Sequence, residues 1–519
     1  MKGLSLHDED SPFSLNMKHS SHLIALIILC FPLLLQAQGV DDAIFNSQTY
    51  YEGTARSMAM GNATGALGGD ITAACINPAG LGLYRSSEFT FSTGLQHTLI
   101  NSNYYDNSRN AGKMRMSIPN VGLVMTGNVS NYKPLRYIQF GFGLTRTNDF
   151  NYRTKAKGLN PNSSMVDAYL QTIQGIDELF NPNANVGDYL YNHYAYDLSP
   201  AWETYLIDRF TDSVGNCFFD SPVPQGDVWQ SDIVTSKGRS EEWTLALSAN
   251  YYDKLFIGTS IGLTHIKRIS TRTYQETPAG SNTNFYEWGH QEELGDTAWG
   301  ANFKCGLIYF PASWLRIGAA WHSRTLYAIG ENWATETSTT LKNNNGSENY
   351  HKYLSPTLYQ SYEFHTPHSF IGSAAFIIGQ QGMISADVEY MNYGNSKFNS
   401  YEYSFSDANQ DIQNTLKPTY NFRLGTEWRM RQYFLRGGAA YYGSPYGFGE
   451  DYGSVKKIAF GIGYATQEDS YWDFAYELTE STTGYTPYRF YVDGQNVVND
   501  IVQHRWRSKF IITLKVKIE

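Results

Sequence analysis

Charged residues in this chain recur at alternate positions of segments whose other residues are apolar. In the segment that starts at Tyr420, Arg423 and Glu427 lie between aromatic and aliphatic side chains. The chemistry open to such residues is electrostatic, because carboxylates and guanidinium groups on one face pair with each other or line a polar passage. Both signs of charge occur, so a strongly ion-selective pore is not indicated. The residues that we assign to a polar lumen lining are Arg316, Arg423, Glu427, Arg436, Asp473 and Glu477.

A second group of residues forms a turn inside a stretch that has few large side chains. Residues 54–86 are rich in Gly and Ala and contain Asn77-Pro78-Ala79-Gly80. Pro78 fixes its own φ and disfavours helix for Asn77, and Asn tolerates tight turns. Such a stretch builds no core of its own, so we expect it to sit inside another structure. In that setting we predict that Asn77, Pro78, Ala79 and Gly80 form a hatch or gate.

No catalytic or metal-binding constellation stands out in the sequence. It contains no G-x-S-x-G elbow and no phosphate-binding loop. Cys75, Cys217 and Cys305 have neither the spacing of a zinc site nor that of a disulfide framework. His365 and His368 lie close in sequence but have no evident third ligand. We therefore predict no catalytic residue, no metal, no cofactor and no enzymatic activity.

The elements that must position these residues are strands. Alternation of apolar and polar residues with a period of 2 predicts about fourteen of them, an even number, as closed bacterial barrels require. In the last segment, for example, Phe510, Ile512 and Leu514 alternate with polar residues. The predicted strands lie near residues 87–100, 114–127, 135–149, 240–252, 254–270, 295–310, 313–329, 357–379, 382–395, 414–430, 431–443, 453–467, 470–483 and 498–519.

The connections between these segments alternate in length. This pattern is expected of a barrel that has one end in the periplasm and the other outside the cell. A soluble sandwich or propeller would also show alternating strands, but no blade-like repeat is visible. The predicted fold is therefore all-β, a transmembrane antiparallel β-barrel with an N-terminal hatch inside its lumen. The long connections are at 101–113, 150–239, 271–294, 330–356, 396–413, 444–452 and 484–497, and those between them are short.

The composition agrees with a membrane barrel. The chain has 519 residues, of which 42% are hydrophobic, 15% aromatic and only 17% charged, and its net charge of −10 argues against a nucleic-acid partner. Lys18, the apolar run 23–35 and Ala37 predict an export signal, with Met17 as an alternative start. The predicted domains are the signal peptide 1–37, the hatch 38–86, and the barrel 87–519 with its long insertion 150–239.

The insertion 150–239 is unusually long, and connections of this length tend to be functional. Apolar residues at helical spacing predict two amphipathic helices, one from Met165 to Phe180 and one from Trp202 to Phe210. These helices either pack on each other as a lid over the outer mouth or offer an apolar groove to a hydrophobic ligand. The candidate residues of that outer groove are Tyr169, Ile173, Phe180, Trp202, Leu206 and Phe210.

The order of these features resembles the FadL/TodX family of outer-membrane transporters for hydrophobic compounds. The resemblance rests on the strand number and on three motifs ahead of the first strand, which are Ala55-Arg56-Ser57-Met58-Ala59-Met60-Gly61, Ala66-Leu67-Gly68-Gly69-Asp70 and Asn77-Pro78-Ala79-Gly80-Leu81. It implies a monomeric barrel among the lipids of a Gram-negative outer membrane. A hydrophobic small molecule, such as a long-chain fatty acid or an aromatic compound, would bind at the outer mouth and leave sideways after a hatch rearrangement. Two other functions stay open: a general porin, and a secretion or cell-surface assembly factor with secretion-system partners.

Overall fold

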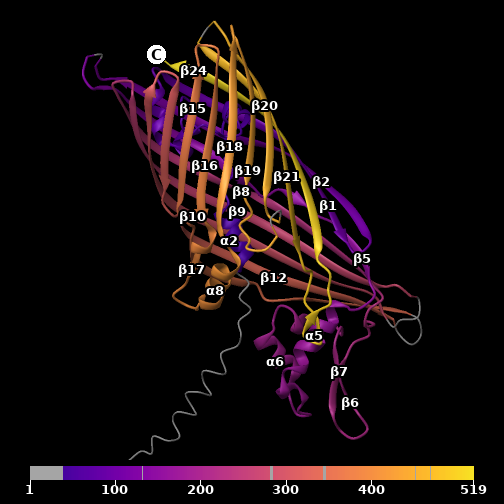
Figure 1. The fold of residues 1–519 in the computed structure, drawn as a ribbon. Coiled ribbons are helices and arrows are strands. Elements are labelled where there is room, and N and C mark those ends of the chain that lie inside the picture. Colours follow the sequence, from indigo (N-terminus) through magenta and orange to yellow (C-terminus); the bar gives the residue numbers. More distant parts are fainter. Residues whose placement is uncertain are drawn as a thin grey trace, which may run out of the picture. The chain divides into compact units, whose positions relative to one another are not determined.

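The computed structural model describes residues 39–130, 132–280, 285–342, 347–449, 452–467 and 469–518. The predicted signal peptide lies outside these residues. From Gln38 onward the chain forms one compact unit. In Figure 1 its strands wrap around the helices of the N-terminal region, which are drawn in indigo.

The strands close into an antiparallel barrel, which confirms the predicted fold. Consecutive wall strands pair with each other, and β24 (Ile501–Ile518) pairs with β1 (Ser87–Tyr104) along nearly its whole length. At two places a pair of short strands takes one position in the wall. Over the described residues the wall has fourteen positions. Between β1 and β24 they are β2 (Asn107–Asn128), β3 (Leu135–Asp149), β8 (Val228–Tyr251), β9 (Leu255–Pro278), β10 (Phe285–Ala312), β11 (Leu315–His322) with β12 (Leu326–Lys342), β14 (Leu358–His365) with β15 (Ser369–Ile378), β16 (Gly382–Asn392), β18 (Pro418–Met430), β19 (Tyr433–Tyr442), β20 (Val455–Ala465) and β21 (Ser470–Tyr485).

The wall has an apolar outer face and a polar inner face. On β18 the outward side chains of Tyr420, Phe422 and Leu424 are about half exposed, whereas Asn421 and Arg423 between them are buried. Apolar side chains that face outward in this way around a closed sheet are the mark of a barrel in lipid, where they replace water-exposed polar groups. The wall therefore spans a membrane, with charge kept inside.

Several strands are longer than the alternation predicted. β1 and β2 meet across only Tyr105 and Asp106, so the predicted loop 101–113 is almost entirely strand. Most of the predicted loop 271–294 likewise belongs to β9 and β10. These extensions carry polar residues on both faces, because they lie beyond the apolar band, and they were wrongly predicted as loops for that reason. Figure 1 shows them reaching out at the end of the barrel that carries α5 and α6.

Residues 39–86, which we call the N-terminal segment, lie against the inner face of the wall. The segment contains the helices α2 (Val40–Ser47), α3 (Ala55–Ala59) and α4 (Ala73–Ile76) and the 3-10 helix η1 (Pro78–Leu83). α3 contacts β19, β20, β21 and β24, whereas η1 contacts β3, β8, β9 and β10. Nearly all side chains of residues 51–84 are buried, although none of these helices is long. The barrel wall supplies the packing that the small residues of the segment lack.

Helices also cover part of the long-loop end of the barrel. Residues 161–227, which we call the lid, share one hydrophobic cluster with side chains of β9 and β10. Ser164 caps α5 by accepting a hydrogen bond from the Val166 amide, and Asp167 accepts one from the Ser164 amide. The lid elements are α5 (Met165–Gln174), η2 (Asp177–Phe180), α6 (Val186–His193), α7 (Leu198–Glu203), β6 (Asp208–Thr211) and β7 (Cys217–Asp220).

The second predicted helix, from Trp202 to Phe210, is wrong. α7 ends at Glu203, Tyr205 takes a left-handed backbone conformation with φ of +56°, and Phe210 lies in β6. A non-glycine residue with positive φ breaks a right-handed helix. The apolar residues of this stretch belong to different environments, because Leu206 is buried between α7 and β6 whereas Phe210 is exposed on β6. Smaller elements at this end are β4 (Tyr152–Arg153), β5 (Ala156–Asn160), β13 (Glu348–Leu354), η3 (Tyr393–Asn395), β17 (Lys397–Asn399), α8 (Ser406–Thr415), β22 (Tyr491–Val492) and β23 (Gln495–Asn496).

Among the described residues, no helix combines the length and the apolar character that crossing a membrane would need. Cys75, Cys217 and Cys305 are free thiols. No three potential metal ligands come together in this part of the chain.

Candidate functional site

The predicted gating turn is buried against the wall. Asn77 ends α4, and its side-chain oxygen accepts a hydrogen bond of 3.2 Å from the Ala79 amide. Its amide nitrogen donates to the Gly65 carbonyl at 2.7 Å, within the N-terminal segment, and to the Leu307 carbonyl of β10 at 3.3 Å. Asn77 thus ties three parts of the structure together through one side chain.

Two glycines of the wall let this turn approach closely. A Cβ atom added at Gly258 of β9 would overlap the Pro78 backbone, and one added at Gly306 of β10 would overlap the side chain of Asn77. Glycine in a strand interior often marks such an approach of another backbone. The fit places Asn77 and Pro78 directly on the inner surface of the wall, and Ala79 and Gly80 lie buried beside them.

Replacing Asn77 should weaken the predicted gate. Asn77→Ala removes three hydrogen bonds, each worth about 0.5–1.5 kcal/mol, so the turn should lose roughly 2–3 kcal/mol of local stability. We expect uptake of a radiolabelled long-chain fatty acid by a complemented strain to fall several-fold. The exposed Asn192→Ala in α6 is the control, since it should leave uptake unchanged. Wild-type uptake by Asn77→Ala would remove this turn from any gating role.

Three of the predicted lining residues meet in one buried ionic network. Glu427 accepts hydrogen bonds from Arg56 of the N-terminal segment at 2.9 Å and from Arg436 at 2.6 Å. Arg436 also donates to Asp473 at 2.6 Å, and Lys515 lies 3.7 Å from Asp473. Charge-assisted pairs of this kind are strong when they are shielded from water. The network therefore fixes the segment to β18, β19, β21 and β24.

Asp70 makes the second ionic contact between the segment and the wall. Its carboxylate accepts hydrogen bonds of 2.7 Å from Lys515 and from Thr54. Burial works against ionisation of Asp70, but the charges of Lys515 and Arg56 outweigh it and hold the pKa of this carboxyl well below its usual range. Asp70 is therefore ionised at neutral pH and stays available to Lys515.

The other predicted lining residues also face inward but lie apart from this network. Arg423 pairs with Glu389 at 3.1 Å and lies 3.7 Å from Asp387. Glu477 pairs with Lys457 at 3.3 Å. Arg316 donates to the Leu67 carbonyl of the N-terminal segment at 3.1 Å. The charges thus pair between neighbouring strands of the wall or hold the segment, which is one of the two roles that the sequence left open.

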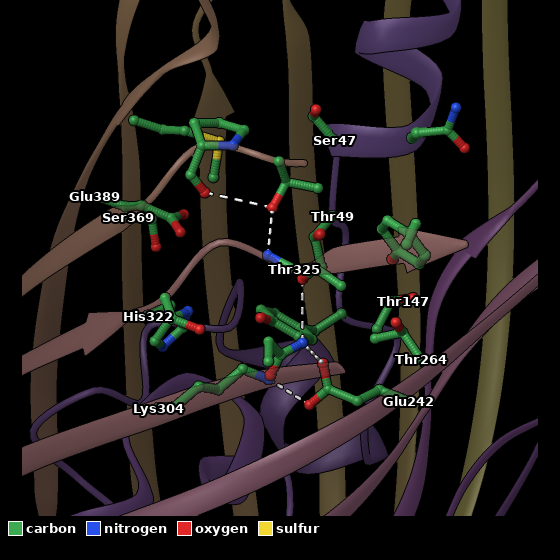
Figure 2. Close-up of a pocket in the computed structure, with 18 residues that line it drawn as sticks. Ser47, Thr49, Thr147, Glu242, Thr264, Lys304, His322, Thr325, Ser369 and Glu389 are labelled. Carbon is green, nitrogen blue, oxygen red and sulfur yellow. Dashed lines mark hydrogen bonds and ion pairs between the residues drawn. The ribbon is translucent and has the colours of Figure 1, made fainter. Parts of the chain in front are cut away.

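The lumen also contains a polar chamber of about 50 Å³, which has room for a few water molecules (Figure 2). Lys304 pairs with Glu242 at its floor, and His322 donates to the Ile76 carbonyl at 2.9 Å. A hydrophobic molecule gains nothing in such surroundings, because burying these groups without partners is costly. Figure 2 shows the other polar groups around the chamber, Ser47, Thr49, Thr147, Thr264, Thr325, Ser369 and Glu389.

A second chamber, of about 200 Å³, has both apolar and basic walls, and we call it the aromatic–basic chamber. Lys457 in this wall is paired, but Arg505 and Arg507 form no ion pair with any described residue. The Nε atoms of both arginines are buried and have no hydrogen-bond partner in this part of the chain. Buried donors of this kind can bind an acceptor that a ligand supplies. The apolar side consists of Ile44, Phe45, Tyr50, Phe150, Tyr152, Tyr446 and Val455.

Residues 46–51 separate the two chambers. Thr49 and Tyr51 line the polar chamber, whereas Gln48 and Tyr50 line the aromatic–basic chamber. The alternation follows from an extended backbone, which sends successive side chains to opposite sides. Side chains of the N-terminal segment therefore form part of the wall of both chambers.

The wall beside the aromatic–basic chamber contains a seam. β2 pairs with β3 only over residues 120–128, and its residues 107–119 pair with β1 but with no described strand on the other side. The pairing of β3 with β8 has a bulge there, between Arg146 and Asn148, and the Arg146 and Thr147 carbonyls of β3 accept hydrogen bonds from the Glu52 and Tyr50 amides of the N-terminal segment. The segment thus takes the place of β2 at this edge.

The predicted groove residues are mostly inside the lid. Tyr169, Ile173 and Leu206 are buried in its hydrophobic cluster, and Phe180 and Trp202 pack against that cluster. Phe210 lies apart from them on the exposed hairpin, stacked on Phe218. This is the self-packed arrangement, and a groove would form from these residues only when the lid opens.

The lid is fixed to the barrel through one buried carboxylate. Glu276 of β9 accepts hydrogen bonds from the Ser164 hydroxyl, the Met165 amide, Gln230, Tyr274 and Trp288, at 2.5 to 2.9 Å. Five donors satisfy a buried carboxylate without a cationic partner. The start of α5 is therefore anchored to the extended ends of β8, β9 and β10.

Sequence analysis missed Arg505 and Arg507, which lie near the start of the last strand, because we considered only the charges of its end. It also missed Pro119 as a signal of the seam. Proline cannot donate to a strand ladder and is confined to edges and bulges. Pro119 lies where the pairing of β2 with β3 ends and where the register of β1 and β2 shifts.

The chain was compared with known proteins. No family model matches its sequence, and no curated protein matches it. Among solved structures, a Pseudomonas aeruginosa FadL homologue superposes with a TM-score of 0.54 at 12% identity, over 91% of this chain and 100% of that one. A deltaS2 mutant of the TodX monoaromatic hydrocarbon channel superposes with a TM-score of 0.51 at 12% identity, over 90% of this chain and 99% of that one. The chain therefore has the fold of the FadL-like outer-membrane channels.

Proposed function

We propose that this protein is a passive outer-membrane transporter of hydrophobic small molecules, and that its ligands carry an acidic head group. The observation that carries the proposal is the aromatic–basic chamber, in which apolar side chains face two arginines without anionic partners. Guanidinium groups bind carboxylates through charge-assisted hydrogen bonds. A chamber of about 200 Å³ suits the head and first carbons of an elongated ligand.

The surroundings of the chamber support a route through the wall. An apolar chain gains little by crossing the polar chamber, but it gains by entering lipid. The seam along residues 107–119 borders the chamber through Asn148, Asp149 and Phe150. In this proposal the N-terminal segment moves as a hatch, β3 moves with it, and the ligand leaves sideways. Asn77 and Pro78 hold the segment between transport events.

The TodX neighbour is described as a monoaromatic hydrocarbon channel, which supports a hydrophobic ligand but not an acidic one. The two arginines should therefore distinguish acidic ligands from neutral hydrocarbons. A neutral hydrocarbon would use only the apolar side of the chamber. A fatty-acid-like carboxylate would use both sides.

The test is the double variant Arg505→Gln/Arg507→Gln. A hydrogen bond to a charged group contributes about 1.5–3 kcal/mol, so the affinity for oleate should fall roughly 10- to 100-fold. Binding of toluene should change by less than about twofold, because it needs no acidic contact. Tryptophan fluorescence titration of the purified protein in detergent measures both.

The exposed Arg489→Gln serves as the matched control and should bind oleate as the wild type does. Equal loss of oleate and toluene binding in the double variant would point to collapse of the chamber. Unchanged oleate binding would refute the acidic head group.

A further inference from the structure

The seam between β2 and β3 is closed by side chains where backbone pairing is missing. Lys113 of β2 donates to the Ser236 carbonyl of β8 at 2.7 Å. Arg115 of β2 donates to the Gly238 carbonyl at 3.1 Å and pairs with Asp149 of β3, also at 3.1 Å. Two long cationic side chains thus reach from the unpaired part of β2 to β3 and β8.

The seam is bounded at both ends by ordinary contacts. At one end, pairing of β2 with β3 begins at Asn120 and Thr145. At the other, Tyr104 near the tip of the β1–β2 hairpin donates to Gln230 of β8, and a Cβ atom added at Gly158 of β5 would meet Tyr104. The unpaired stretch is therefore a gap in the backbone pairing, with β4 and β5 beside it, rather than a frayed end, and we call this gap the window.

The exposure of β2 agrees with an open edge. Met114 and Met116 on its outer face are 66% and 75% exposed, more than the half-exposed side chains elsewhere on the wall. On its inner face, Lys113 and Arg115 are only partly buried, although inward side chains of other strands are mostly buried. A strand with backbone groups unpaired on one side separates more easily from its neighbour than a fully paired one.

Asp149 connects this window to the aromatic–basic chamber. Asp149 lines the chamber, and its carboxylate forms an ion pair with Arg115. The Arg146 guanidinium lies 3.5 Å from the same carboxylate oxygen. Gln96 donates to the other oxygen of Asp149 at 3.1 Å, and Arg507 of the chamber donates to its carbonyl at 3.2 Å. The anion that holds Arg115 therefore sits beside the arginine that would hold the ligand.

We propose that Lys113 and Arg115 form a latch that keeps the window shut, and that an anionic ligand in the chamber releases it. A carboxylate bound by Arg505 and Arg507 adds a negative charge next to Asp149 and competes for Arg115. Repulsion between the two carboxylates and the loss of the Arg115 contact weaken the link between β2 and β3. Entry of the head group and opening of the exit are thereby coupled. This inference rests on the proposed function.

The decisive variant is Lys113→Met/Arg115→Met, which keeps side-chain length and removes both charges. We expect transfer of anthroyloxy-labelled stearate from the protein to liposomes to be about three- to tenfold faster, because two charge-assisted bonds across the window are gone. The dissociation constant for the same probe should not rise, because neither residue lines the chamber and binding no longer has to break the Arg115 contact. Arg109→Met, exposed on the same strand, should leave both values unchanged.

A ligand-free measurement separates this inference from the proposed function. Hydrogen exchange of the amides of residues 110–118 in the detergent-solubilised protein should be faster in the double variant than in wild type, and Arg109→Met should match wild type. Unchanged exchange would overturn the latch, and so would slower or unchanged transfer. If wild type binds no labelled stearate at all, the proposed function fails, and the exchange experiment alone decides whether the latch exists.

Discussion

Deleting residues 39–84 is expected to convert the barrel into an open pore. The fourteen-position wall pairs its strands without help from the N-terminal segment, apart from the bent edge of β3. Without the segment, the polar inner face would be exposed to water along its whole length. Influx of a small polar solute such as arabinose should rise about tenfold or more, because a barrel of this size with an empty polar lumen is a water-filled channel.

Liposome swelling measures this influx directly. Heat-modifiable migration on gels and β-sheet circular dichroism should show that the shortened protein still forms a barrel. Deleting the hairpin 208–220 is the matched control, since these strands pair only with each other within the described residues. Wild-type influx in the deletion of 39–84, with an intact barrel, would contradict the view that the segment fills the lumen.

Loss of the Glu427 carboxylate is expected to loosen the segment without removing it. Glu427→Met leaves Arg56 buried without its carboxylate partner, while Arg436 keeps Asp473. Removing one partner of a buried ion pair lowers stability by about 3–5 kcal/mol. Because the wall strands pair with each other independently of the segment, the lost free energy should weaken the docking of the segment rather than the wall. Arabinose influx should therefore rise, though less than in the deletion.

The double variant Arg56→Met/Glu427→Met provides the control for this prediction. Replacing both members of a buried ion pair with apolar side chains of similar volume is often nearly neutral. Influx should therefore return toward the wild-type value in the double variant. If the double variant leaks as much as Glu427→Met or more, the effect comes from lost packing and the ion pair does not hold the segment.

Much of the wall could be predicted from the sequence. In β18, for example, Tyr420, Phe422 and Leu424 alternate with polar residues, and this alternation indicates a strand with one face toward lipid and the other toward the polar lumen. The ends of the strands could not be predicted. In β9 and β10 the polar extensions continue the ladder through pairing with each other, and no single strand carries that signal. The helix expected up to Phe210 failed for a different reason, since apolar residues at helical spacing need not share one face: Leu206 is buried, whereas Phe210 is exposed on the hairpin.

The lumen residues show the same limit. Their inward direction follows from alternation, but their partners do not. Arg56 and Glu427 meet from positions 371 residues apart, and Asp70 and Lys515 from positions 445 apart. Only the closed barrel decides that Glu427 joins Arg436 and Asp473 while Arg423 joins Glu389. The aromatic–basic chamber escaped prediction because it draws on α2, β3, β20, β21 and β24 at once.

The ionic contacts of the N-terminal segment have a consequence for biogenesis. Two of its carboxylates, Glu52 and Asp70, bond to Lys509 and Lys515, and both lysines belong to β24. β24 is also the strand whose pairing with β1 completes the circle. Until that last strand is in place, the segment lacks both of these ionic contacts, although its contacts with the other strands are already available. Full docking of the segment therefore requires the closed barrel, which links sealing of the lumen to the last step of barrel closure.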